Sequence, residues 1–337
     1  MTNEKNNLFS DATNLDPVAQ TFSLTMVGTG GLSRLYEPDY RNFAPRASIA
    51  WDVRGTSKTV VRAGWGMFYD QFSQDFFLGH LPYPPFFDPG PAYNPVGPAP
   101  VLASVNTSGS ISSGPIYDTV GLAACQLKEC DSFTVDRHIR TPYMENYNLN
   151  IQQQVGRNVA VQVGYVGSQG HRLFRFRDLN QPNQAAIMAD DLACGCDDSY
   201  GVPRVYGGVF GDNNPFAAFY LMQEEASAKS NYNSLQASLR LTNWRGITSI
   251  VNYSWSKSLD TASDGEDFEN NAAQPNDSTR PNLEYGPSNF NVPNRFSWVF
   301  AYELPNSGSS RLRKGWGFSS TAVLQSGQPF QMNYNFE

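Results

Sequence analysis

The chain of 337 residues carries 24 lysines and arginines against 31 aspartates and glutamates, for a formal net charge of −7. Charged residues make up only 16% of the chain, whereas aromatic residues make up 13%. So many aromatic residues exclude a disordered chain. The acidic net charge argues against nucleic-acid binding, which needs a basic surface. No apolar run is long enough for a transmembrane helix.

Nine segments alternate apolar and polar residues with the period of two that a half-buried strand requires. The clearest places Phe296, Trp298 and Phe300 on one face, with Arg295 and Ser297 on the other. In chain order, the nine predicted strands are 21–28, 44–53, 59–70, 143–155, 159–169, 232–243, 247–258, 295–305 and 316–327.

The connections between these strands alternate between long and short. The long ones are 29–43, 71–142, 170–231 and 259–294, and the short ones are 54–58, 156–158, 244–246 and 306–315. Outer-membrane barrels show this alternation, because their short turns face the periplasm and their long loops face the outside. The sequence therefore predicts an all-β fold, an antiparallel transmembrane β-barrel segment of about nine meandering strands, with a soluble β-sandwich as the alternative.

The two faces of the predicted strands differ in chemistry. Aromatic side chains fall near the strand ends of one face, as in the aromatic girdles of outer-membrane barrels. The predicted girdle comprises Trp51, Tyr69, Tyr147, Tyr165, Tyr253, Trp255, Phe296, Trp298 and Tyr302. Polar side chains on the other face are predicted to point into the lumen, and they are Arg46, Asp52, Arg62, Asp70, Gln152, Gln162, Arg240, Asn252, Arg295 and Glu303.

Several of these segments resemble the barrel domain of TonB-dependent outer-membrane receptors of the Oar-like subfamily, which carries a carboxypeptidase-regulatory-like N-terminal domain. The matching stretches occur in the family's order and cover most of 40–330. They are FAPRASIAWDV (43–53), KTVVRAGWGMFYDQF (58–72), TPYMENYNLNIQQQV (141–155), VQVGYVGSQGHRLFR (161–175), SNYNSLQASLRL (230–241), VNYSWSKSLDTASD (251–264) and GPSNFNVPNRFSWVFAYELP (286–305).

The resemblance implies a place in the bacterial outer membrane and uptake of a bulky nutrient, energised by the TonB complex from the periplasm. It implies outer-membrane lipid, a plug domain, the TonB complex and an unknown extracellular ligand as partners. The alternative is a surface binding or adhesion protein that acts through its long extracellular loops.

The chain also departs from the family pattern. Residues 1–20 show no signal peptide and form a poorly defined N-terminal segment, and no plug or TonB box is recognisable. Nine strands are fewer than the roughly 22 of barrels that hold a plug. We therefore expect residues 21–337 to be a partial barrel, with its plug and TonB contacts in other parts of a longer parent.

Four cysteines lie in predicted long loops. A Cys125–Cys130 disulfide is expected, while Cys194 and Cys196 either pair in a tight ring or stay reduced. A four-cysteine metal site is the weaker alternative, because the spacings fit common zinc patterns poorly.

Acidic residues cluster in the predicted loop 259–294. Its weak candidate calcium ligands are Asp264, Glu266, Asp267 and Glu269, although their spacing is not that of an EF-hand. A solvated acidic loop is the favoured interpretation. Ser254 and Lys257 have the S-x-x-K spacing of an acyl-enzyme, but a strand puts them on opposite faces. The sequence therefore predicts no enzyme, no cofactor and no firm metal site.

Overall fold

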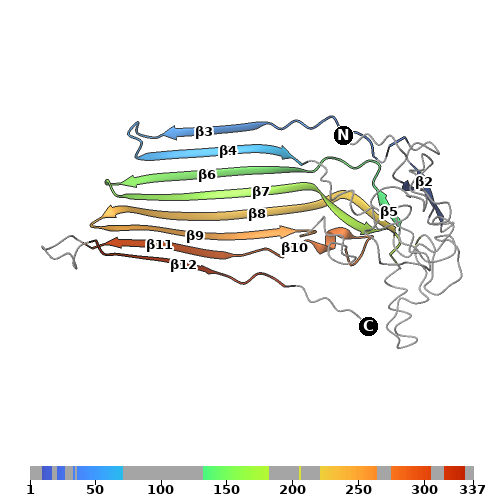
Figure 1. Cartoon of the computed structure of the whole chain (residues 1–337). Coiled ribbons are helices and arrows are strands. Elements are labelled where there is room, and N and C mark those ends of the chain that lie inside the picture. The colour runs from blue at the N-terminus through green and yellow to red at the C-terminus, as the bar shows by residue number, and fades with distance from the viewer. Residues whose placement is uncertain are drawn as a thin grey trace, which may run out of the picture.

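The computed structural model describes residues 10–16, 21–26, 33–34, 36–70, 132–181, 205, 221–263, 275–304 and 315–330. Eight strands form one antiparallel meander in the order β3-β4-β6-β7-β8-β9-β11-β12 (Figure 1). Their bounds are β3 (Arg46–Asp52), β4 (Thr59–Tyr69), β6 (Tyr143–Val155), β7 (Val159–Asp178), β8 (Leu221–Trp244), β9 (Ile247–Asp260), β11 (Asn294–Glu303) and β12 (Gly317–Gln325).

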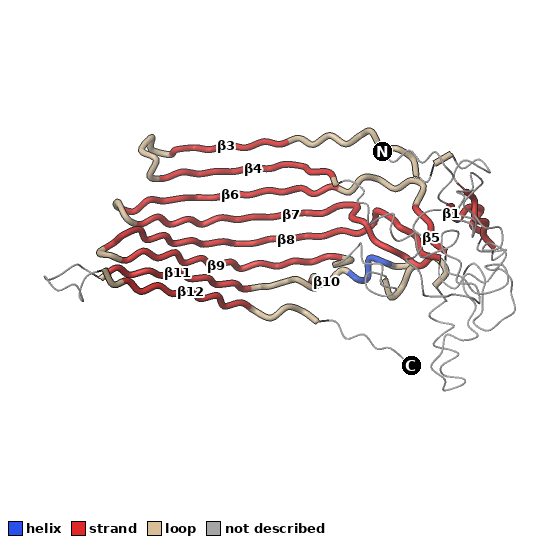
Figure 2. The backbone as a smooth tube through the Cα atoms, viewed as in Figure 1, coloured by secondary structure: helices blue, strands red, loops and turns tan. Residues whose placement is uncertain are grey.

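The fold is nearly all-β and antiparallel, which confirms the prediction. Figure 2 shows the strands lying side by side in one long sheet. The sheet is open, because β3 and β12 each pair with a single neighbour among the described strands. In the described part of the chain, the helix is η1 (Pro281–Glu284), and no helix has the length and apolar character to cross a bilayer.

The short turns 54–58, 156–158 and 244–246 lie at one end of the sheet, the left end in Figure 1. Their backbones explain their sequences. Arg245 and Gly246 between β8 and β9 both have positive φ, 54° and 85°, as a tight two-residue hairpin turn requires. A Cβ on Gly246 would also lie 2.5 Å from the carbonyl oxygen of Glu303. Glycine is therefore required there both for the turn and for the approach of β11.

The first predicted strand, 21–28, does not join the main sheet. Thr21–Met26 forms β2, which pairs with β1 (Ser10–Asp16) in a separate two-stranded sheet. Eight of the nine predicted segments therefore build the meander. The difference has a simple reason: alternation specifies an extended segment with two unlike faces, but it does not specify the neighbouring strand.

Two strands extend far beyond their predicted ends. β7 continues to Asp178 and β8 begins at Leu221, inside the predicted loop 170–231. A short parallel strand, β5 (Ser132–Val135), pairs with the start of β8, and β10 (Gly286–Pro287) pairs with β9. We call this region, residues 132–139, 172–181, 221–228 and 275–285, the outer cap.

The buried apolar side chains of the described residues gather in the outer cap. They are Val135, Ile139, Phe174, Phe176, Leu221, Met222 and Ala228. The meander itself is a single layer, exposed on both faces. Its stability therefore depends on what covers those faces, because a sheet needs a second layer or a lipid phase to bury its apolar side.

Candidate functional site

The strand register places nine of the ten polar residues predicted to face the lumen on one face of the sheet, and the tenth, Asp70, directly follows the end of β4. Directly paired residues of antiparallel strands lie on the same face. Arg62 pairs with Asn150, and Gln152 pairs with Gln162 across the next strand boundary. The row continues through Ser238, Asn252 and Ser297. We call this the polar face.

Side-chain hydrogen bonds connect the polar face across strand boundaries. Arg62 donates to the Gln152 oxygen at 2.9 Å, and Gln162 donates to Asn150 at 3.3 Å. Further along, the hydroxyl of Ser238 donates to Asn252 Oδ1 at 2.8 Å. These pairs tie neighbouring strands together and hold donors and acceptors toward the space in front of the sheet.

An open hollow of about 450 Å³ lies over the polar face at β7, β8, β9 and β11. Amide, hydroxyl and guanidinium groups line it, namely those of Gln162, Gln236, Ser238, Asn252, Ser254, Arg295 and Ser297. Such a surface is chemically suited to hydrated or polar solutes, because its side chains offer both donors and acceptors.

All nine residues of the predicted girdle lie on the opposite face, which we call the aromatic face. Trp51 pairs with Val61, and Tyr302 pairs with Ile247, both near the short turns. Trp51 and Trp255 are 57% and 60% exposed. Trp65 and Trp244 also lie on this face, but the predicted girdle did not include them. The alternation could have indicated Trp65, which is four residues before Tyr69 and therefore on the same face of the strand. Large exposed apolar groups on one face are typical of contact with lipid.

A glycine makes room for the aromatic packing on this face. A Cβ on Gly167 would lie 2.1 Å from Cε2 of Tyr147, so the Tyr147 ring rests directly on the backbone of β7. The phenol groups of Tyr147 and Tyr165 both donate to Asn233 Oδ1 on β8. The two rings and the amide thus join β6, β7 and β8.

Beyond the membrane-spanning length of a strand, which is about 9–11 residues, β7 bends at a bulge. Arg172 there has a φ of 55°, and the pairing with β8 shifts on both sides of Leu173. Past the bulge, Arg175 is 1% exposed, and burial lowers the pKa of its guanidinium. One of its nitrogens donates to the Pro281 carbonyl at 3.2 Å. The strand extension therefore anchors segment 275–285.

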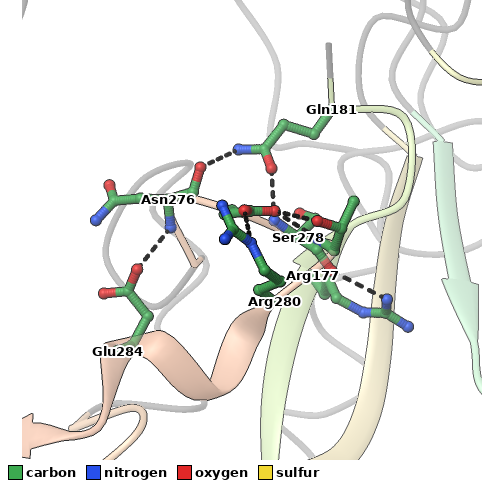
Figure 3. Close-up of polar contacts among 8 residues, drawn as sticks. Arg177, Gln181, Asn276, Ser278, Arg280 and Glu284 are labelled. Carbon is green, nitrogen blue, oxygen red and sulfur yellow. Dashed lines mark hydrogen bonds and ion pairs between the residues drawn. The ribbon is translucent and has the colours of Figure 1, made fainter. Parts of the chain in front are cut away.

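Arg177 makes the main polar connection of the outer cap. Its guanidinium lies 2.7 Å from Glu225 Oε2 on β8 and donates to the Ser278 carbonyl at 3.2 Å. Gln181 donates to the Asn276 carbonyl and accepts from the Ser278 amide at 2.6 Å (Figure 3). These contacts hold a segment about 100 residues away in sequence against the end of β7.

Asp277 organises the turn that enters this segment. Its carboxylate accepts from the hydroxyl and amide of Thr279 and from Arg280 Nε at 2.7 Å. These bonds, led by the one from the Thr279 hydroxyl, lower the pKa of Asp277 to about 2. The turn is followed by η1, where Glu284 accepts from the Asn276 amide at 3.0 Å.

Some predicted site residues lie outside the described residues. They are Cys125, Cys130, Cys194 and Cys196, together with the acidic candidates Asp264, Glu266, Asp267 and Glu269. Across the ranges that the structure describes, no group of three or more His, Cys, Asp or Glu side chains is arranged to hold a metal ion.

The sequence prediction also missed the polar contacts of the outer cap. A signal was present, because Leu173-Phe174-Arg175-Phe176-Arg177 continues the alternation of β7 past its predicted end. Its partners Glu225, Gln223 and Ser278 come from distant segments, so the sequence alone did not indicate them.

Comparison with known proteins defines the class. The whole chain, residues 1–337, matches the family model of the outer membrane beta barrel domain. The protein belongs to this family, and its place is the bacterial outer membrane. No curated protein matches the sequence.

Among solved structures, the chain is similar to the outer membrane transporter YddB from Escherichia coli, with 15% identity and a TM-score of 0.47 over 85% of this chain and 29% of that one. The FrpB iron transporter from Neisseria meningitidis (F3-3 variant) shows 10% identity and a TM-score of 0.37, over 79% and 25%. A chain of the FpvAI–pyocin S2 complex shows 8% identity and a TM-score of 0.34, over 79% of this chain and 20% of that one. The chain spans less than a third of the length of each.

Proposed function

We propose that this chain is part of the barrel wall of a TonB-dependent receptor of the Oar-like type, whose parent takes up a bulky nutrient across the outer membrane. The observation that carries the proposal is the separation of the two faces. Nine of the ten predicted polar residues share one face, and nine predicted aromatic residues share the other, in a chain of the outer-membrane barrel family.

In this proposal the aromatic face contacts lipid and the polar face lines the lumen. Arg62, Gln152 and Asn252 offer hydrogen bonds to a plug or a passing solute. A solute must exchange water for wall contacts and then leave, so many modest hydrogen bonds suit passage better than a few strong ion pairs.

Cysteine labelling tests which face of the sheet is exposed to water. In a background with the four native cysteines replaced by serine, Gln162→Cys should react with a membrane-impermeant maleimide in isolated outer membranes. Its sequence neighbour Val163→Cys, on the aromatic face, should not. Equal labelling of the two positions would contradict the assignment of the lumen.

A surface binding or adhesion function is the second candidate, and the outer cap favours it. The buried core of the described residues lies in the cap, which gives the extracellular end a defined shape of its own. The two functions are separated by measuring which nutrients the cells remove from a defined medium. Uptake that needs both this protein and an intact TonB complex supports transport. Surface binding that persists without the TonB complex, with no uptake, supports adhesion.

A further inference from the structure

Four basic side chains gather on the aromatic face at its long-loop end. His171 pairs with Tyr143 on one side and with Lys229 on the other, so the three share this face. Lys257 pairs with Asn233 on the same face, nearer the short turns. Arg172 follows His171 at the bulge. We call His171, Arg172, Lys229 and Lys257 the outer cationic patch.

Aromatic rings hold the patch in place. The His171 ring stacks on Tyr143, with centroids 4.8 Å apart, and the Arg172 guanidinium carbon lies 5.8 Å from the Tyr143 centroid. Lys229 Nζ lies 5.2 Å from the ring centroid of Tyr285. Cations at these distances are attracted to the ring face, which orders long side chains that would otherwise move freely.

The patch has an excess of positive charge. Arg172, Lys229 and Lys257 are exposed, and within the described part of the chain none of the three forms an ion pair. Glu145 is the acidic side chain one pair inward from Tyr143 on this face, where it faces Gln169. Among the residues that the structure describes, three exposed cations of this face therefore stand beside one carboxylate of the same face.

The depth of the patch matches the boundary of the bilayer. Lys257 lies about ten residues beyond the start of β9 at Ile247, and a tilted strand crosses the hydrocarbon layer in about 9–11 residues. Trp255 and Tyr253 lie just inside Lys257 on the same face. Lys257 is thus placed just outside the aromatic girdle, at the level of lipid headgroups. Lys229 lies four positions further from the short turns than Asn233, the partner of Lys257, so the other cations of the patch lie on the outer side of that level.

We propose that the outer cationic patch binds the phosphate of anionic lipid headgroups in the outer leaflet. Exposed ammonium and guanidinium groups at headgroup depth, in excess over carboxylates, are complementary to phosphate. The adjacent aromatic and apolar side chains of the same face accommodate the acyl chains. This site is independent of whichever solute the lumen carries.

The test uses the complete protein purified in nonionic detergent, titrated with phosphatidic acid or phosphatidylcholine and read by native mass spectrometry. The variant Arg172→Gln/Lys229→Gln/Lys257→Gln should bind phosphatidic acid about 100-fold more weakly, at roughly fivefold for each cation removed. Binding of zwitterionic phosphatidylcholine should not change. The single variant Lys257→Gln, far from the cap, should lose about fivefold by itself.

The matched control is Lys58→Gln/Arg157→Gln/Arg245→Gln, which removes three cations from the short turns at the other end of the sheet. Arg245 also lies over an aromatic ring, 5.3 Å from the centroid of Trp244. This control should keep wild-type affinity for phosphatidic acid. Circular dichroism confirms equal strand content in all variants.

Three results would overturn the proposal. Equal losses in the two triple variants would mean that any boundary cation acts alike. Equal binding of phosphatidic acid and phosphatidylcholine would remove the role of charge. Displacement of the lipid by millimolar inorganic phosphate would assign the patch to free phosphate instead of a headgroup.

Discussion

At the scale of single residues, the aromatic face depends on one missing side chain. Gly167 leaves room for the Tyr147 ring, which reaches Asn233 across β7. Small residues beneath an aromatic ring in a sheet are a recognised way to pack a pair across strands. The glycine on β7 therefore permits a contact between Tyr147 on β6 and Asn233 on β8, which are two strands apart.

Gly167→Ala should destabilise the protein by about 1–3 kcal/mol, because the new methyl group displaces the Tyr147 ring and breaks its hydrogen bond. Urea unfolding in detergent micelles measures the change. Gly64→Ala is the control, since its Cβ would meet the flexible Asn148 amide at 3.2 Å. If the loss in Gly167→Ala persists in the double variant with Tyr147→Ala, the ring is not its cause.

Asp277 sets a pH dependence of the cap. Its folded pKa is about 2 and its ordinary value is 3.8, so its contribution to holding the turn is complete above about pH 4. That contribution is lost as the pH falls from 4 through 2, when the carboxylate gains a proton and no longer accepts from Thr279 and Arg280.

Carbon-detected NMR of the Asp277 carboxyl should show a midpoint near pH 2. In Asp277→Asn, hydrogen exchange of segment 275–285, corrected for intrinsic rates, should no longer respond between pH 4 and pH 2. An Asp277 midpoint near pH 4 would mean that the hydrogen bonds of the turn do not stabilise the charged carboxylate.

At the scale of elements, the outer cap is a small folded unit attached to the ends of β7 and β8. Arg177 connects β7, β8 and segment 275–285, and Glu225 opposite it is nearly buried, with 7% of its side chain exposed. Removing the cation would leave that carboxylate without its partner in a poorly solvated place, which is more destabilising than losing a surface pair.

Arg177→Met, which keeps much of the side-chain volume, should therefore reduce the local stability of the cap by about 3 kcal/mol. Hydrogen exchange of 275–285 and of β5 reports it. Arg280→Met is the control, because the Arg280 side chain is 67% exposed and its bond to Asp277 should contribute less than about 1 kcal/mol. Equal effects of the two substitutions would show that Arg177 is no more important than a surface ion pair.

At the scale of the whole molecule, the single-layer meander has two unlike faces that need two unlike surroundings. Trp51, Trp65, Trp244, Trp255 and Trp298 lie on the aromatic face by register. Nothing in the described wall buries them within the chain. Lipid is the phase that can cover such a face in an outer-membrane protein.

In liposomes, lipids with brominated acyl chains should quench more than about half of the tryptophan fluorescence, since the rings lie within the apolar band or at its edges. Aqueous iodide should quench little. The reverse order would place the tryptophans in water and would contradict the assignment of the two faces.

The sequence by itself determined the strands of the meander, their short turns and the chemistry of each face. A period of two is a local property of the sequence. Once the short turns fix the register, alternate residues lie on opposite faces, so Arg62 and Gln162 fall on the polar face and Trp65 and Tyr165 on the aromatic face. Because the pattern is local, it correctly predicted strands at 159–169 and 232–243, which lie within β7 and β8.

Only the tertiary structure decided that 21–26 stays outside the meander, and where the buried core lies. Residues 21–26 have the same alternation as the meander strands yet pair with β1. Arg177, Glu225 and Ser278 come together only because β7 and β8 continue past the wall and meet a distant segment. Such contacts depend on long-range pairing and burial, which no local pattern encodes.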